Sequence, residues 1–384
     1  MTATPDIDKR VDARIVAPTA NALAGEASNG LRLAAGIAAR LRRFATWLVA
    51  ATVVIATCIA VPAAAQVASP QAIDIPRWFT ESFLDFKDEV AEAARAGKRV
   101  LVYFGQDGCP YCKALMQANF GRGAVAEKIT AKTRANFVAI AINIWGDREV
   151  SWLDSTRASE KELARRLAVQ FTPTLLFLDT DGRIVLRLNG FQPPERFGPI
   201  IDWVADRQDR SESLAEYLAA RDATAPVQPA PSGTYLMRDP AALARRPGGK
   251  PLVVLFESER CAPCAEMHRE AFRRATILPL LARFDIARLV PGQPARLVTP
   301  AGPPAEARAF ARDLQIALHP TVVFFDAGGR EAFRFDGYMR PFHVESAFDY
   351  VASGAYTREP QFQRFVQERA EALRKAGRPV DLWK

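Results

Sequence analysis

Twice in this chain an apolar run ends in a short polar turn and a Cys-x-x-Cys pair. The first stretch is RVLVYFGQDGCPYCK, at 99–113, and the second is KPLVVLFESERCAPCA, at 250–265. Branched and aromatic residues that stop at a polar turn predict a buried strand, and the helical pattern after them predicts a helix. We therefore expect two strand–helix units, each with its cysteine pair in the first turn of the helix.

The position of each pair predicts its chemistry. At a helix start, the unpaired backbone N–H groups and the positive end of the helix dipole favour the thiolate form of the first cysteine. The second cysteine lies about one turn further on and can attack a mixed disulfide formed by the first. The pattern predicts a dithiol redox centre at Cys109 and Cys112 and another at Cys261 and Cys264.

A longer repeat surrounds two proline turns. The stretch FTPTLLFLDTDGRIVLRLNGFQPPERF around Pro173 aligns without a gap with LHPTVVFFDAGGREAFRFDGYMRPFHV around Pro320. The alignment pairs Pro173 with Pro320, Thr174 with Thr321, Asp179 with Asp326, Gly190 with Gly337 and Pro194 with Pro341. Self-similarity over so long a period indicates two copies of one domain.

Composition sets the broad class. The 384 residues are 49% hydrophobic and 24% charged, an ordinary globular mixture for two to three domains. The net charge of +8 comes from basic residues scattered among acidic ones, which predicts a solvated surface and no nucleic-acid binding. Four of the five cysteines stand in the two pairs and the fifth, Cys58, lies in an apolar segment, so no framework of structural disulfides is expected.

The N-terminal region predicts export. Residues 1–43 are Ala-rich and polar, and we expect them to be poorly ordered. In 44–66, after a basic flank, an apolar run precedes a small-x-small site, which predicts a secretory signal cleaved after Ala65 and a periplasmic or otherwise exported protein. The run is slightly long for a signal and just long enough for a membrane span, so an inner-membrane anchor at 44–61 is the alternative.

The first domain is expected at 72–221. Its apolar periodicity and turn residues predict alternating helices and strands, with a polar insertion at 145–159. The predicted helices are 83–96, one through about 119, 160–169, 194–205 and 212–220, and the predicted strands are 99–104, 135–144, 174–178 and 184–188.

A linker and a second domain follow. Residues 222–233 contain ATAPVQPAPSG, whose alternating prolines predict a semi-rigid extended connection. In the second domain, 234–384, Asp239 and Pro240 predict a helix start. Further strands are predicted at 252–256 and 284–290, then a helix at 305–314, two strands, and helices from about 344 and at 361–376.

These features resemble the thioredoxin fold, over about 72–206 and 234–355. The resemblance implies an α/β protein with two thioredoxin-like domains, each a central mixed sheet flanked by helices, and it is closest to exported thioredoxin-related proteins. It also implies that Cys109 and Cys261 attack, and that Cys112 and Cys264 resolve. In the family a cis proline faces the cysteines and its neighbours bind extended substrate backbone, which carries over to Thr172 with Pro173 and His319 with Pro320.

The chain departs from thioredoxins proper at two positions in each copy. Gly108 and Arg260 stand where thioredoxins have Trp before the first cysteine. Tyr103 and Leu255 stand where they have a buried Asp that assists proton transfer. The dipeptides between the cysteines also differ, Pro-Tyr against Ala-Pro, and because this dipeptide tunes thiolate stability we expect two unequal redox centres.

Two other uses of the cysteines are disfavoured. Four cysteines in two pairs can bind one zinc ion, but each pair has its own strand, helix and proline turn, so we expect no metal. Inert structural disulfides are also disfavoured, because so short a loop stabilises little. His268 is expected to be a surface helix residue, whereas His319 is either a plain turn residue or one that contacts substrate or tunes the pKa of the site.

The expected function is an exported thiol:disulfide oxidoreductase. It would act on protein disulfides or thiols without a metal or organic cofactor, and exchange electrons with a donor or acceptor on the membrane side. A relay between the two pairs across the linker is a further hypothesis. The alternative is a non-catalytic peptide-binding module or chaperone in which one or both redox sites are inactive.

Overall fold

The computed structural model describes residues 72–228, 231, 233–293, 295–337 and 339–381. The chain divides into Met1–Ala68 and Ser69–Lys384, and the described elements belong to the second part. The predictions for 1–43 and 44–66 lie outside the described residues and stay predictions. Within the described ranges, no helix is long and apolar enough to cross a membrane.

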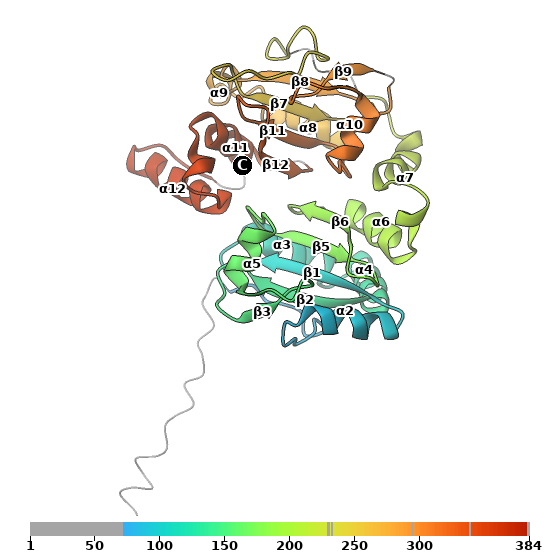
Figure 1. Ribbon diagram of the computed structural model, residues 1–384. Coiled ribbons are helices and arrows are strands. Elements are labelled where there is room, and N and C mark those ends of the chain that lie inside the picture. The colour runs from blue at the N-terminus through green and yellow to red at the C-terminus, as the bar shows by residue number, and fades with distance from the viewer. Residues whose placement is uncertain (1–71, 229–230, 232, 294, 338, 382–384) are drawn as a thin grey trace, which may run out of the picture. The chain divides into compact units, whose positions relative to one another are not determined.

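A four-stranded mixed sheet forms the centre of the first domain. Its strand order is β2-β1-β5-β6 (Figure 1), and β1 pairs in parallel with β2 and antiparallel with β5. The strands are β1 (Arg99–Gly105), β2 (Phe137–Asn143), β5 (Thr174–Leu178) and β6 (Ile184–Asn189). Every residue of β1 is buried, which explains its unbroken apolar run, because a central strand between two layers of helices has no solvated face.

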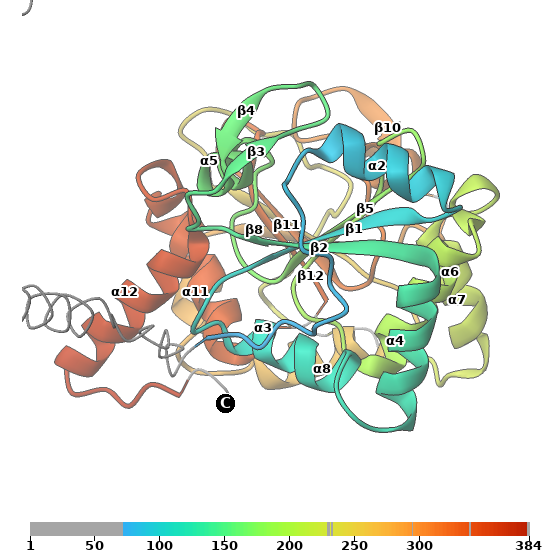
Figure 2. The same cartoon turned by 90° about the horizontal axis from the view of Figure 1, so that it is seen from below.

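Helices cover both faces of this sheet. Helices α2 (Phe86–Arg95) and α5 (Glu160–Arg166) share a core with Val100, Val102 and Phe104. Helices α4 (Ala124–Asn136), α6 (Pro194–Ala205) and α7 (Leu214–Arg221) share the other core with Leu101 and Tyr103. Figure 2 shows α2 and α4 on opposite sides of β1 and β2. Alternate β1 side chains thus pack into the two cores, as the two-residue period of a strand requires.

The second domain repeats the sheet. Its order is β12-β11-β7-β8, with β7 parallel to β8 and antiparallel to β11. The strands are β7 (Leu252–Phe256), β8 (Asp285–Leu289), β11 (Thr321–Phe325) and β12 (Glu331–Asp336). The predicted fold class, two thioredoxin-like domains with mixed sheets flanked by helices, is confirmed.

The helices of the second domain are distributed unequally. One face carries α8 (Ala262–Glu270), α9 (Leu278–Leu281), α11 (Pro341–Ala352) and α12 (Phe362–Lys375), which share one large aromatic core. The other face carries α10 (Ala307–Asp313). Single turns of 3-10 helix lie at Gln208–Arg210, Asp222–Thr224 and Ala355–Thr357.

Each polar insertion contains a small hairpin. In the first domain β3 (Glu149–Ser151) pairs antiparallel with β4 (Arg157–Ser159), within the predicted insertion 145–159. In the second, β9 (Arg296–Val298) pairs with β10 (Pro304–Glu306). The second hairpin shows that the predicted helix 305–314 begins later, at Ala307.

Helix α4 was not predicted, and the strand expected from 135 begins at Phe137. The helix has a weak signature because its buried residues are only Ala126, Ile129 and Thr133, and no side chain caps its start. Small and polar residues thus replace the strong apolar stripe on which a helix prediction depends.

The helix predicted to start at Asp239 and Pro240 does not form. Asp239 Oδ1 accepts a hydrogen bond from the Ala241 N–H, but the segment then stays irregular. Leu243 N–H instead donates to the Val298 carbonyl, and Met237 N–H donates to that of Ile286. The segment therefore satisfies its backbone along the sheet and the hairpin, where the first domain has α2.

Candidate active sites

The first cysteine pair lies where β1 ends and a helix begins. Cys109 is the N-cap of α3 (Pro110–Ala114), which continues as a π-helical turn at Leu115–Asn119. Its Sγ accepts a hydrogen bond of 3.1 Å from the Cys112 N–H, and the two cysteines form a disulfide with their Cα atoms 5.2 Å apart. Both side chains are buried, and Cys109 is only 1% exposed.

The second pair repeats this geometry. Cys261 is the N-cap of α8, and its Sγ accepts a hydrogen bond of 3.1 Å from the Cys264 N–H. The pair forms a disulfide with the same Cα separation of 5.2 Å. The first sulfur of each pair therefore lies at the positive end of a helix dipole, where negative charge on a thiolate is stabilised.

The two predicted proline turns contain cis peptide bonds, at Thr172–Pro173 and His319–Pro320. The carbonyl oxygen of Thr172 lies 3.4 Å from the Cys109 Sγ, so this turn is in contact with the first redox centre. The residue after each proline fixes its turn, because the Thr174 and Thr321 hydroxyls donate 2.9 Å hydrogen bonds to carbonyls three residues earlier.

His319 is half-buried and lines a cavity beside the second centre together with Glu257 and Arg260. Its Nε2 is buried and has no hydrogen-bond partner among the described residues. Burial, with a smaller contribution from the nearby Arg196 charge, lowers the pKa of His319 to about 4. The imidazole is therefore neutral at physiological pH, where it can donate or accept a hydrogen bond but carries no charge.

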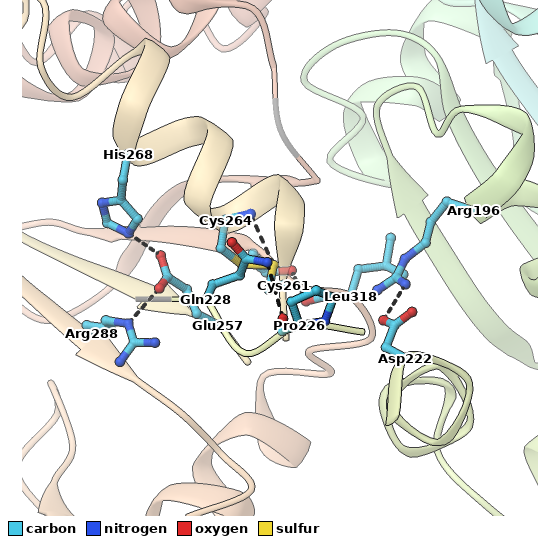
Figure 3. The surroundings of a disulfide bond; sticks show 11 residues. Arg196, Asp222, Pro226, Gln228, Glu257, Cys261, Cys264, His268, Arg288 and Leu318 are labelled. Carbon is cyan, nitrogen blue, oxygen red and sulfur yellow. Dashed lines mark hydrogen bonds and ion pairs between the residues drawn. A yellow bond between two sulfur atoms is a disulfide. The ribbon is translucent and has the colours of Figure 1, made fainter. Parts of the chain in front are cut away.

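A buried acid lies beside the second pair. Glu257 is the residue after β7 and is 1% exposed. One carboxylate oxygen lies 2.6 Å from His268 Nε2, and the other accepts a 2.6 Å hydrogen bond from Arg288 Nε. Figure 3 shows the three side chains next to the Cys261–Cys264 disulfide. Burial raises the pKa of Glu257, but the bonds and charges of His268 and Arg288 outweigh it, and the pKa falls below its usual value.

The prediction that His268 is a surface residue was wrong. The side chain is 9% exposed, and its Nδ1 lies 2.6 Å from the Tyr235 hydroxyl while Nε2 faces Glu257. One turn after Cys264, His268 lies on the helix face that packs inward with that cysteine. The combination of a charged residue directly after a buried strand and a histidine on the inner face of the next helix was the available signal.

The first domain has no such network. Gly105, Met116 and Ala141 stand where the second domain has Glu257, His268 and Arg288. Tyr103 fills the space, because a Cβ added at Gly105 would clash with its ring and hydroxyl. The hydroxyl of Tyr103 is buried without a hydrogen-bond partner among the described residues, and burial raises its pKa.

In the described part of the chain the cysteines are paired within each domain. Each cysteine pair forms its own disulfide, and no group of three or more His, Cys, Asp or Glu side chains there is placed to hold a metal ion. Each site thus comprises two sulfurs at a helix start and a cis-proline turn, an arrangement that can pass between dithiol and disulfide.

Comparison with known proteins agrees with this class of site. The family described as "Thioredoxin-like domain" matches residues 86–205 and 241–352, which together make up more than half of the chain. The chain therefore belongs to the thioredoxin-like family, with two copies of the domain. No curated protein matches the chain. The family and the two cysteine pairs support a thiol–disulfide oxidoreductase.

Solved structures include similar proteins. A thioredoxin-fold protein from Helicobacter pylori is 26% identical over 33% of this chain and 80% of its own, with a TM-score of 0.27. A thioredoxin from Thermus thermophilus is 26% identical over 31% of this chain and 83% of its own, with a TM-score of 0.24. A domain of the alkylhydroperoxide reductase of Enterococcus faecalis is 13% identical, covering 71% of this chain and 100% of its own, with a TM-score of 0.23.

Proposed function

We propose that this protein is an exported thiol:disulfide oxidoreductase that acts on protein thiols and disulfides through both cysteine pairs. The observation that carries the proposal is the disulfide found in each copy at a helix start, with a cis-proline turn in the same domain. Extended substrate backbone would lie along Thr172 and Pro173 at one site and His319 and Pro320 at the other.

In the reducing direction, the Cys109 or Cys261 thiolate attacks a substrate disulfide and forms a mixed disulfide, releasing one substrate thiolate, which takes up a proton. The Cys112 or Cys264 thiol then loses its proton and attacks the mixed disulfide, releasing the second substrate thiol. Two electrons and two protons pass to the substrate, and the protein keeps an intramolecular disulfide. A dithiol or equivalent donor on the membrane side returns it to the reduced form; the reverse sequence oxidises substrate thiols.

The first experiment is to measure the reduction potential of each pair. The protein from residue 66 is equilibrated in glutathione buffers, alkylated and digested, and the four cysteine peptides are quantified. Potentials near or below about −230 mV would make it a reductant, and values above about −180 mV an oxidant or isomerase. A pair that never forms a disulfide would contradict the proposal for that domain and favour a peptide-binding module.

The relay between domains is tested separately. The different dipeptides, Pro-Tyr and Ala-Pro, support two potentials, and electrons would pass from the lower to the higher. If Cys261→Ser leaves turnover at Cys109 unchanged with the physiological partner, the relay is wrong.

Export is tested by fractionating cells that express the full chain. Protein found inside the cell with residues 1–65 attached would contradict export.

A further inference from the structure

Each cis-proline turn places one apolar side chain in the core of the other domain. Phe171, two residues before Pro173, lies in the aromatic core of the second domain, with its ring centroid 5.7 Å from Phe333 and 6.0 Å from Phe362. Leu318, two residues before Pro320, lies in turn in a core of the first domain. Each turn therefore anchors its own domain to the other one.

A buried polar contact joins the ends of the last strands. The backbone N–H and side-chain amide of Asn189 donate hydrogen bonds of 3.1 and 2.8 Å to the same oxygen of Asp336. Both residues are less than a tenth exposed. They stand 147 residues apart, so they occupy equivalent positions in the two copies. The strand end that belongs to the substrate side of each domain thus faces its counterpart.

The glycines that follow these residues permit the close approach. Gly190 and Gly337 have φ angles of +110° and +77°. A Cβ at Gly190 would lie 3.5 Å from the Asp336 carbonyl oxygen, and one at Gly337 would lie 2.7 Å from Gln192 Nε2. A side chain at Gly337 would displace the Gln192 amide of the other domain, and its positive φ is one that residues other than glycine rarely adopt.

The first redox centre is closed by the second domain. Tyr111, between the two cysteines, accepts a 3.1 Å hydrogen bond from the Arg340 N–H, and its hydroxyl lies 3.4 Å from His343 Nδ1. The cavity left between Tyr111, Thr172, Met339 and His343 measures about 10 Å³, at most one water molecule. No peptide fits there while this contact holds.

We propose that the second domain is the resting occupant of the first domain's substrate face, and that a protein partner reaches Cys109 only after the domains part at Asn189–Asp336 and Tyr111–Arg340. This inference rests on the proposed function, because it concerns access of protein thiols and disulfides to the pair. The attacking group must approach the sulfur of Cys109, which is 1% exposed. A small reductant needs only a brief opening, whereas a folded protein needs the whole turn exposed.

The Asn189–Asp336 contact allows a charge-swap test. Asn189→Asp has nearly the same shape, and its carboxylate can still accept from Arg187 Nε. It replaces the amide that donates to Asp336 with a second carboxylate, which favours separation of the domains. Asp336→Asn keeps one oxygen, which can accept from Asn189, while its NH₂ group takes the place of the oxygen that faced the Thr321 hydroxyl. The double variant, Asn189→Asp with Asp336→Asn, restores the side-chain donor–acceptor pair with its direction reversed, and only the bond from the backbone N–H of residue 189 is lost. It is the matched control, because the carboxylate introduced at position 189 then faces an amide that can pair with it.

The readout is the reduction of the oxidised full chain by reduced thioredoxin and, separately, by dithiothreitol. Alkylation and mass analysis follow Cys109. We expect Asn189→Asp to speed reduction by thioredoxin about tenfold or more, because like charges in an interface cost more free energy than a tenfold change requires. The dithiothreitol rate should change far less, and the double variant, which regains the side-chain pair, should return most of the way to the original rates. X-ray scattering should show a larger radius of gyration for Asn189→Asp alone.

A second variant avoids any change to the strand ends. Arg340 has φ −57°, which proline adopts, so Arg340→Pro removes the N–H that binds Tyr111. Arg340→Ala keeps that N–H and is its control. We expect Arg340→Pro, and not Arg340→Ala, to speed reduction of the first pair by thioredoxin, with the circular dichroism spectrum unchanged.

Three results would overturn the inference. Equal rates of reduction by thioredoxin for the original protein and Asn189→Asp would refute the closure and leave the proposed function standing. An Asn189→Asp protein with an unchanged radius of gyration would show that this contact does not hold the domains together. Failure of every variant to react with either reductant would refute the proposed function and the inference together.

Discussion

The surroundings of the two cysteine pairs differ although the strands, helices and proline turns correspond. In the second domain Glu257, His268 and Arg288 form a buried charged network beside the disulfide. In the first domain that place is filled by the ring of Tyr103 over Gly105. The fold thus fixes where the sulfurs lie, whereas the residues packed beneath them decide whether charge is present near the pair.

The largest expected effect concerns Glu257. Glu257→Ala leaves Arg288 and His268 without their buried partner, which we expect to cost about 3–5 kcal/mol of the unfolding free energy of the second domain. Chemical denaturation measures it. Glu259→Ala is the control, because Glu259 is exposed and accepts a single side-chain hydrogen bond, from Gln293. If both variants lose the same stability, the network does not hold the second domain together.

The stability of the second domain should depend on pH because its buried histidines resist protonation. His343 is buried and its pKa is lowered to about 4 by that burial, whereas the equivalent first-domain residue is Arg196. The unfolded chain binds the proton near pH 6.5, so this stability is complete above pH 6.5 and is lost as the pH falls toward 4. We expect a loss of about 2–3 kcal/mol between pH 7 and pH 4.5.

Denaturation midpoints at the two pH values test this. His343→Gln should be less stable than the original protein at pH 7 and should lose less stability on acidification. His319, also with a pKa lowered to about 4, should contribute in the same direction, and its first-domain counterpart is the uncharged Thr172. An acid-induced loss that His343→Gln does not reduce would contradict the assignment to His343.

A smaller effect is expected at Gly105. Gly105→Ala brings a Cβ against the Tyr103 ring, and such overpacking costs about 1–3 kcal/mol of unfolding free energy. The double variant Gly105→Ala with Tyr103→Leu, which introduces the second domain's residue at that position, should recover most of the loss. Gly292→Ala is the control, since nothing lies within 4 Å of its added Cβ. Equal losses for the two Gly→Ala variants would exclude the steric explanation.

The smallest expected effects are those of two Tyr→Phe variants, which should change the unfolding free energy in opposite directions. Tyr103→Phe removes a buried hydroxyl that has no hydrogen-bond partner among the described residues, so it should be neutral or stabilising by up to about 1 kcal/mol. Tyr235→Phe removes the hydroxyl that contacts His268 and should cost about 1 kcal/mol. Thermal or chemical unfolding compares the two, and a loss at Tyr103 as large as at Tyr235 would contradict the expected difference.

The sequence predicted the strands and cysteine pairs that local patterns specify. Unbroken apolar runs predicted strands β1, β5 and β7, and the Cys-x-x-Cys spacing predicted that the cysteines lie at helix starts. Sequence reasoning missed α4, whose inner face is built from small and polar residues such as Ala126 and Thr133, and it placed a helix at Asp239 where the backbone pairs with a hairpin instead.

Local sequence patterns do not predict which residues long-range packing brings together. Glu257 and Arg288 meet only because β7 and β8 are parallel neighbours in the sheet, and His268 joins them from α8. The contact of Asn189 with Asp336 spans 147 residues and requires both domains. The role of the predicted site residues in catalysis stays a prediction.

The meeting of Asn189 with Asp336 has a consequence for how such a protein can diversify. If two identical chains were packed face to face about a two-fold axis, residues at equivalent positions near that axis would have to be the same, so Asp would meet Asp and repel. Covalent fusion removes that constraint. A donor can then be placed on one half and an acceptor on the other, and the two halves can acquire different chemistry while keeping a shared interface.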